Sequence, residues 1–227
     1  MWFLRPGVTP EFAILKILAT LIVIFLIMPF HEYAHGFVAY KLGDNTAKSF
    51  GRLSFNPLHH VDPIGALAIL LFGIGWAKPV PVDPRNFKNR RLGTFLVALA
   101  GPFANFLSAF LGGFILNALI KFNQGGLDNF AATTMQLFLE FFIVLNISLA
   151  VFNLIPIPPL DGSKILESCL PNRLVYKMYS YQRIISIVLL IAVFLGVLSY
   201  PLQIINSNVF KWIINITALP FGNQWSI

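Results

Sequence analysis

A run of 29 residues without a charged side chain, residues 92–120, constrains this chain more than any other feature. About 20 apolar residues in a helix are enough to cross the hydrocarbon core of a bilayer. Three further runs, residues 12–30, 132–152 and 184–202, carry at most one charge each. The pattern predicts an all-α polytopic membrane protein with about four transmembrane helices. The expected spans are about 12–40, 92–120, 132–155 and 184–205, within a single membrane-embedded domain over 1–227.

The composition supports the same class. Only 11% of the residues are charged, whereas a soluble domain carries roughly 25%, so an ordinary soluble enzyme is excluded. The 23 Phe residues and long apolar runs exclude a disordered chain. A lone cysteine, Cys169, leaves no disulfide framework and no cysteine-rich metal cluster. In a membrane protein a net charge of +7 marks cytoplasmic loops, so the lipid bilayer, and no nucleic acid, is the expected partner.

The positions of the basic residues predict how the chain lies in the membrane. Of the 16 Lys and Arg residues, eight fall within 41–91 and four within 161–183. Cytoplasmic loops carry an excess of Lys and Arg. Both loops are therefore expected in the cytoplasm and both termini outside, in a multi-pass protein of the cell membrane.

Shorter features are expected at the cytoplasmic face. The apolar segment 64–77 has only 14 residues, too few for a straight span, so it is expected to form a re-entrant hairpin. Segments 50–55 and 78–82 predict a small β element, because prolines keep the second one extended. An exposed edge there could pair with an unwound substrate, and an ordinary interfacial loop is the alternative. The tail 208–221 is expected to be a weaker, interfacial segment.

The first span runs into His31-Glu32-Tyr33-Ala34-His35, an H-E-x-x-H motif. On a helix the two histidines are one turn apart and face the same way, so both imidazoles can reach one metal ion. Glu32 lies beside them, near enough to take a proton from a metal-bound water. Ionisable residues are costly in a membrane helix unless they are paired or functional, which favours a metal site over a chance match.

A catalytic zinc site needs a third protein ligand and one open position. Asp161 is the preferred candidate, because it follows an extended, proline-rich segment at the end of the third span. At 1.5 Å per residue, His31 lies about 29 Å along the first helix and residue 154 about 33 Å along the third. Asp161 and the histidines are therefore expected at one depth near the cytoplasmic face; a simple turn or helix cap at Asp161 is the alternative. The other candidates are Asp62, Asp83, Glu140, His59 and His60.

These motifs together resemble the site-two protease family of intramembrane zinc metalloproteases, in its compact branch without a PDZ or nucleotide-sensing domain. The resemblance rests on residues 31–35 together with Asn153 and Leu160-Asp161-Gly162, and it extends to residues 51–65, 75–84 and 101–105. It implies that one zinc ion per chain is held by His31, His35 and Asp161, with Glu32 as the catalytic base.

Three more polar residues are weaker candidates. Asn153 lies on the last turns of the third span and could donate to a developing oxyanion; a hydrogen bond between helices is the alternative. Asn105 lies on a face of small residues, and it packs helices together, contacts substrate or supports a metal ligand from behind. His60 matches a family position, where supporting a ligand, contacting substrate or a structural role is favoured over direct ligation.

The motifs predict a zinc metalloendopeptidase that cuts membrane proteins within or near their transmembrane segments, with Glu32 activating a zinc-bound water. A membrane di-iron oxygenase needs more histidines than the four in this chain. A mononuclear iron site with two histidines and one carboxylate would leave Glu32 without a role. A transporter or scaffold with a structural metal would differ in having no open coordination position.

Overall fold

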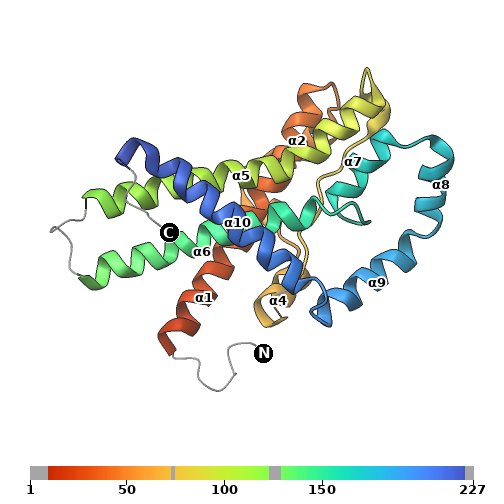
Figure 1. Cartoon of the computed structure of the whole chain (residues 1–227). Helices are drawn as coiled ribbons and strands as arrows, with labels where there is room; N and C mark the ends of the chain where they lie inside the picture. The colour runs from red at the N-terminus through yellow and green to blue at the C-terminus, as the bar shows by residue number, and fades with distance from the viewer. Residues whose placement is uncertain (1–9, 73–74, 123–128, 223–227) are drawn as a thin grey trace.

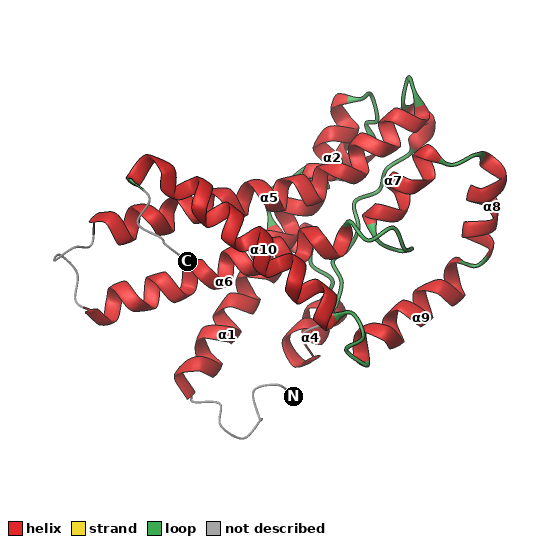
Figure 2. Ribbon diagram, viewed as in Figure 1, coloured by secondary structure: helices red, strands yellow, loops and turns green. Residues whose placement is uncertain are grey.

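The computed structural model describes residues 10–72, 75–122 and 129–222, and the regular structure in these ranges is helical, as predicted (Figures 1 and 2). The chain begins with α1 (Pro10–Ile22), a π-helical turn η2 (Val23–Ile27) and α2 (Met28–Lys41), which follow one another without a break. The other long helices are α5 (Arg90–Phe122), α6 (Asn129–Asn153) and α10 (Ser199–Ala218). The shorter elements are α3 (Thr46–Ser49), η3 (Pro57–His59), α4 (Pro63–Phe72), η4 (Pro84–Asn86), α7 (Asp161–Cys169), α8 (Asn172–Ser180), α9 (Gln182–Phe194) and η5 (Leu219–Phe221).

Three helical stretches within the described residues are long and apolar enough to cross a membrane: Ile17–Lys41, Arg90–Phe122 and Phe130–Asn153. They correspond to the first three spans expected from the sequence. Helices α8 and α9 pass the same test only as a pair, and they meet at a bend of 62°. The described part of the chain therefore has three candidate membrane spans, or four if the bent pair counts as one.

The core lies where α5, α6 and α10 pack together, seen at the centre of Figure 1. Its buried side chains include Leu116 of α5, Ile143 and Ile147 of α6, and Ile213 of α10. The amide of Asn117 also donates to Thr217 Oγ1 across 2.9 Å, joining α5 to α10. Because such a bond between membrane helices contributes only about 0.6 kcal/mol, close packing accounts for most of the cohesion.

The structure divides the fourth expected span, 184–205, into two helices. Helix α9 ends at Phe194, and α10 begins at Ser199. Gly196 lies between them with a φ of +73°, a conformation that cannot continue a right-handed helix. Most of the expected tail, 208–221, belongs to α10, which extends to Ala218 and packs against α5 and α6; its interfacial location stays a prediction.

The small β element expected at 50–55 and 78–82 is absent from the part of the chain that the structure describes. The first segment is a series of turns that follows α3, and the second is extended but is not paired in a ladder. Pro79 and Pro81 have no amide proton, so alternate residues of the second segment cannot donate to a neighbouring strand. The two segments form loops instead, and their position at the membrane interface stays a prediction.

The hairpin expected over 64–77 is present as a helix followed by a returning extended segment. Helix α4 leads the chain away, and the chain then comes back so that the Lys78 amide donates to the His60 carbonyl across 2.8 Å. Residues 73 and 74 lie outside the described residues. Its insertion into the membrane stays a prediction.

Helices α7, α8 and α9 form an arc at one side of the bundle, where they leave the end of α6 and return towards α10 (Figure 1). Within this arc α7 packs against α5. Asp161 is the first residue of α7, so this contact places the aspartate against the middle of the bundle.

Candidate metal centre

Three donor atoms from distant parts of the sequence meet between α2, α5 and α7. Asp161 Oδ2 lies 3.1 Å from His31 Nε2 and 3.2 Å from His35 Nε2. The two Nε2 atoms are 3.0 Å apart, and all three side chains are buried or nearly so. Two imidazole nitrogens and one carboxylate oxygen are the kind of donor set that zinc uses in catalytic sites. The set is therefore able to bind one metal ion.

The geometry follows from local structure. His31 and His35 are four residues apart on α2, so their side chains project from the same face of the helix. Asp161 begins α7, after Leu160 in an extended conformation. The prolines between α6 and α7 prevent the helix from continuing, and the chain turns the aspartate towards α2.

Each imidazole is oriented by a hydrogen bond at its other nitrogen. His31 Nδ1 lies 2.9 Å from Asn105 Oδ1, and His35 Nδ1 lies 2.6 Å from the Val97 carbonyl oxygen. Both partners are acceptors, so each histidine donates from Nδ1. The lone pair of each Nε2 is then directed at the shared site, which is the usual arrangement for histidine ligands.

Gly101 of α5 keeps the space beside the imidazoles open. A Cβ atom at this position would lie 2.4 Å from His35 Nε2 and 2.6 Å from His31 Nε2. No side chain fits at such distances without displacing a histidine. The absence of a side chain at Gly101 leaves room beside both Nε2 atoms, which is consistent with a metal ion bound between them.

Glu32 lies on the same turn of α2 as the histidines but outside the donor set. Its Oε2 accepts a hydrogen bond from the Val80 amide across 2.9 Å. This contact holds one oxygen of the carboxylate against the extended segment 78–82 and leaves Oε1 for another partner. A carboxylate so placed beside a metal site is suited to accept a proton.

Four other ligand candidates, three carboxylates and His59, make local hydrogen bonds, and none of them joins the donor set. Asp62 Oδ1 accepts from the first amides of α4, and Asp83 Oδ1 accepts from the Arg85 amide. Glu140 Oε1 accepts from the Gln136 amide on α6, across 3.0 Å. His59 Nδ1 donates to the Gly51 carbonyl.

The three weaker candidates differ in where they lie. Asn105 is in direct contact with His31. His60 is fully buried away from the donor set, and its Nε2 donates to the Ser54 carbonyl across 2.8 Å. Asn153 is the last residue of α6, where its amide donates to the Leu149 carbonyl one turn back.

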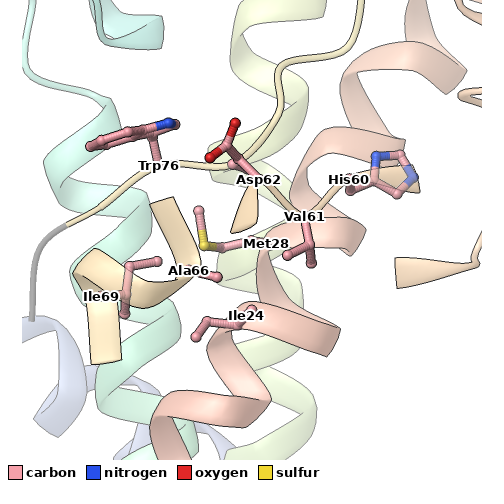
Figure 3. Close-up of a pocket in the computed structure, with 9 residues that line it drawn as sticks. Ile24, Met28, His60, Val61, Asp62, Ala66, Ile69 and Trp76 are labelled. Atoms are coloured by element: carbon pink, nitrogen blue, oxygen red, sulfur yellow. The ribbon is translucent and has the colours of Figure 1, made fainter. Parts of the chain in front are cut away.

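A mostly apolar hollow lies between η2, α2 and α4, separate from the donor set (Figure 3). Figure 3 shows Trp76 and His60 on opposite sides of it, with Met28 and Ala66 between. Among its described lining residues, imidazole and carboxylate donors are found at His60 and Asp62, and Asp62 already caps α4. The hollow is lined by Ile24, Met28, His60, Val61, Asp62, Ala66, Ile69, Trp76 and Ala77.

Sequence reasoning missed the main-chain partners of this centre. The Val97 carbonyl orients His35, and the Val80 amide holds Glu32, but a backbone group leaves no signature in the residue types. It also missed Arg52, a buried side chain that contacts the segment holding Glu32. In the sequence Arg52 is one of eight basic residues within 41–91, and nothing there distinguishes it from the others.

The helices and the buried donor set are those of a membrane metalloenzyme, and comparison with known proteins agrees. The model of peptidase family M50 matches residues 19–199. "Putative zinc metalloprotease YwhC" of Bacillus subtilis (strain 168) is 45% identical over 175 residues, which cover 75% of this chain and 80% of that protein. "Putative zinc metalloprotease MJ0611" of Methanocaldococcus jannaschii is 33% identical over 158 residues, which cover 70% of this chain and 74% of that protein.

A third relative, "Putative zinc metalloprotease Rip2" of Mycolicibacterium smegmatis, is 32% identical over 142 residues, which cover 60% of this chain and 51% of that protein. No solved structure matches the chain with significance. The chain belongs to peptidase family M50, and zinc is its cofactor. The expected family resemblance and the expected metal are thereby confirmed.

Proposed function

We propose that this chain is an intramembrane zinc metalloprotease of the site-two protease type, which hydrolyses peptide bonds within or near transmembrane segments of membrane proteins. The observation that carries the proposal is the convergence of His31, His35 and Asp161 beside Glu32, at one end of a candidate span. His31, His35 and Asp161 are the proposed ligands of one zinc ion per chain. When bound, zinc supplies a Lewis acid that polarises the scissile carbonyl and lowers the pKa of a water.

The residues of the chain supply the proton transfers. Glu32 is the proposed general base, with Oε2 held by the Val80 amide and Oε1 free to take a proton from the attacking water. The same carboxyl then delivers that proton to the leaving amide nitrogen. Asn153 is the proposed donor to the developing oxyanion; to act, its amide exchanges the Leu149 carbonyl for the substrate.

The basic loops support a particular orientation. Loops 41–91 and 161–183 flank the donor set, and their Lys and Arg residues favour the cytoplasmic side. The proposed active site then opens near the cytoplasmic face, with both termini outside. The proposed partners are membrane proteins with a transmembrane segment.

Cleavage of a transmembrane substrate by purified protein in bilayers tests the proposal. Glu32→Gln should retain zinc and lose cleavage by several orders of magnitude, because an amide cannot act as a base at neutral pH. Glu140→Gln is the matched control, since Glu140 also lies within a candidate span but only pairs with Gln136. Near-normal cleavage by Glu32→Gln would overturn the mechanism and favour a scaffold with a structural metal.

A further inference from the structure

The proposed base is held by one main-chain amide in an unusual segment. Residues 78–82 belong to neither helix nor strand, and the prolines at 79 and 81 restrict the residues before them to extended conformations. The Val80 amide donates to Glu32 Oε2 across 2.9 Å. Pro79 and Pro81 flank Val80 and have no amide proton. Among residues 79–81 only Val80 therefore has an N–H group, and this group donates to Glu32.

The same segment is anchored at Lys78, two residues before Val80. The Lys78 carbonyl accepts a hydrogen bond from Arg52 Nη2 across 2.6 Å. The Lys78 amide donates to the His60 carbonyl across 2.8 Å. Both contacts are made by the main chain of Lys78, so they fix where the backbone passes beside α2.

Arg52 makes this contact from a buried position. It is 8% exposed, and its Nε has no hydrogen-bond partner among the described residues. It forms no ion pair within this part of the chain, although the charge of Glu32 is within electrostatic reach. Burying a guanidinium without a paired carboxylate is costly, so a role in packing alone would be served better by an apolar side chain.

We propose that Arg52 is a positioning residue for the base: it fixes the Lys78 carbonyl, and thereby places the Val80 amide on Glu32. The inference rests on the proposed function, in which Glu32 takes the proton. Holding Oε2 keeps Oε1 aimed at the attacking water. Misplacement of a catalytic group by about 1 Å can cost about 100-fold in rate, so a distant anchor is enough to matter.

Kinetics of Arg52 variants give the first test. Arg52→Met should lower kcat by about 10- to 100-fold, with KM changed much less and zinc content unchanged. Arg52→Lys should recover part of kcat, because an ammonium can still donate to the Lys78 carbonyl. Arg85→Met removes an exposed arginine that pairs only with Asp83 and should behave like wild type. A kcat unchanged in Arg52→Met, or a loss explained by lost zinc, would overturn the inference.

Amide exchange gives a second test that does not need turnover. Hydrogen–deuterium exchange of residues 75–83 should be faster in Arg52→Met than in wild type or Arg85→Met, because the Lys78 anchor is gone. Unchanged exchange there would overturn the inference even if activity fell. If wild type cleaves no membrane substrate, the proposed function fails, and the exchange result still decides whether Arg52 anchors the segment.

Two substitutions at Val80 test the inference if Arg52→Met does not fold. Val80→Pro removes the amide proton from an already extended, proline-flanked residue, whereas Val80→Ala keeps it. With equal zinc content, Val80→Pro should turn over at least about tenfold more slowly than Val80→Ala. Equal rates for the two variants would show that the amide does not position Glu32.

Discussion

His31 Nδ1 donates a hydrogen bond to Asn105 Oδ1 across 2.9 Å, and this contact joins α2 to α5 at the metal centre. The bond sets which nitrogen of His31 carries the proton, so that Nε2 is free to bind zinc. The Asn105 amide nitrogen is buried and has no hydrogen-bond partner among the described residues. The sequence left Asn105 as a helix-packing residue, a substrate contact or a support for a ligand; the structure places it against the proposed ligand His31, where it also joins two helices.

Loss of this acceptor should weaken zinc binding. Asn105→Ala should lower zinc affinity by about 10- to 100-fold, the usual effect of removing a partner of a histidine ligand. Asn105→Asp keeps an oxygen opposite Nδ1 and should retain most of the affinity. Competition with a chelator of known affinity measures both. Equal affinity in Asn105→Ala and wild type would mean that His31 does not need the asparagine.

Gly101 should tolerate no side chain. In Gly101→Ala the new Cβ would be 2.4 Å from His35 Nε2 and 2.5 Å from His31 Cε1, so an imidazole must move. We expect zinc content to fall well below one per chain by elemental analysis. Gly112→Ala is the control, because its Cβ would meet Ile143 and Phe142 of α6 instead. That control should unfold at a lower temperature but keep its zinc.

His60 predicts a pH dependence of stability. Burial lowers the pKa of His60 below its ordinary value of about 6.5, and the charge of Arg52 adds to this, whereas the hydrogen bond to the Ser54 carbonyl opposes it. The folded protein thus holds His60 neutral, while the unfolded chain binds a proton as the pH falls through about 6.5. The free energy of unfolding should therefore decrease as the pH falls below that value.

His60→Gln keeps a donor for the Ser54 carbonyl and cannot titrate, so it isolates this effect. Thermal unfolding of both proteins in detergent, from about pH 8 to about pH 5, should give midpoints that fall more steeply for wild type. Protonation of the proposed zinc ligands affects both proteins alike and cancels in the comparison. Parallel pH profiles would contradict a neutral, buried His60.

Asn153 should matter for the rate and not for the metal. Asn153→Ala should keep zinc and slow the chemical step by about 10²- to 10³-fold, the typical cost of removing an oxyanion donor. Single-turnover measurements separate this step from substrate binding. Unchanged single-turnover rates would mean that the Asn153 amide serves only the Leu149 carbonyl.

Much of the architecture could be predicted, because a membrane-spanning helix needs a run of about 20 apolar residues that is visible in the sequence. The run 92–120 has no charge, and α5 covers it. The break near Gly196 could not be predicted in the same way, because single glycines are frequent inside membrane helices and the apolar run continues through it. What separates α9 from α10 is a local φ of +73°, which leaves hydropathy unchanged.

The candidate site divides along a similar line. The spacing of His31 and His35 already indicates a metal site, and the depth estimate and the family resemblance favour Asp161 as the third ligand. The main-chain groups that hold His35 and Glu32, the Val97 carbonyl and the Val80 amide, are harder to predict. Every residue has a carbonyl, and every residue except proline has an amide proton, so residue type does not mark them. Only the folded arrangement determines which of these main-chain groups faces an imidazole or a carboxylate.

The position of the cut should follow from the position of the site. His31 and His35 lie in the second half of the candidate span Ile17–Lys41, towards the end that leads into the basic loop 41–91. We therefore expect cleavage near the cytoplasmic end of the substrate's transmembrane helix, with the product released to the cytosol.

A helical substrate engages its carbonyls in hydrogen bonds four residues apart, so the scissile stretch must unwind first. Gly, Pro or Asn near the cut should speed cleavage, and a run of Leu should slow it, because leucine favours the helix. Sequencing the fragment ends from reconstituted protein measures this directly, with a Leu-rich substrate of equal length as the control. A cut at the bilayer centre or on the outer side would contradict the proposed orientation.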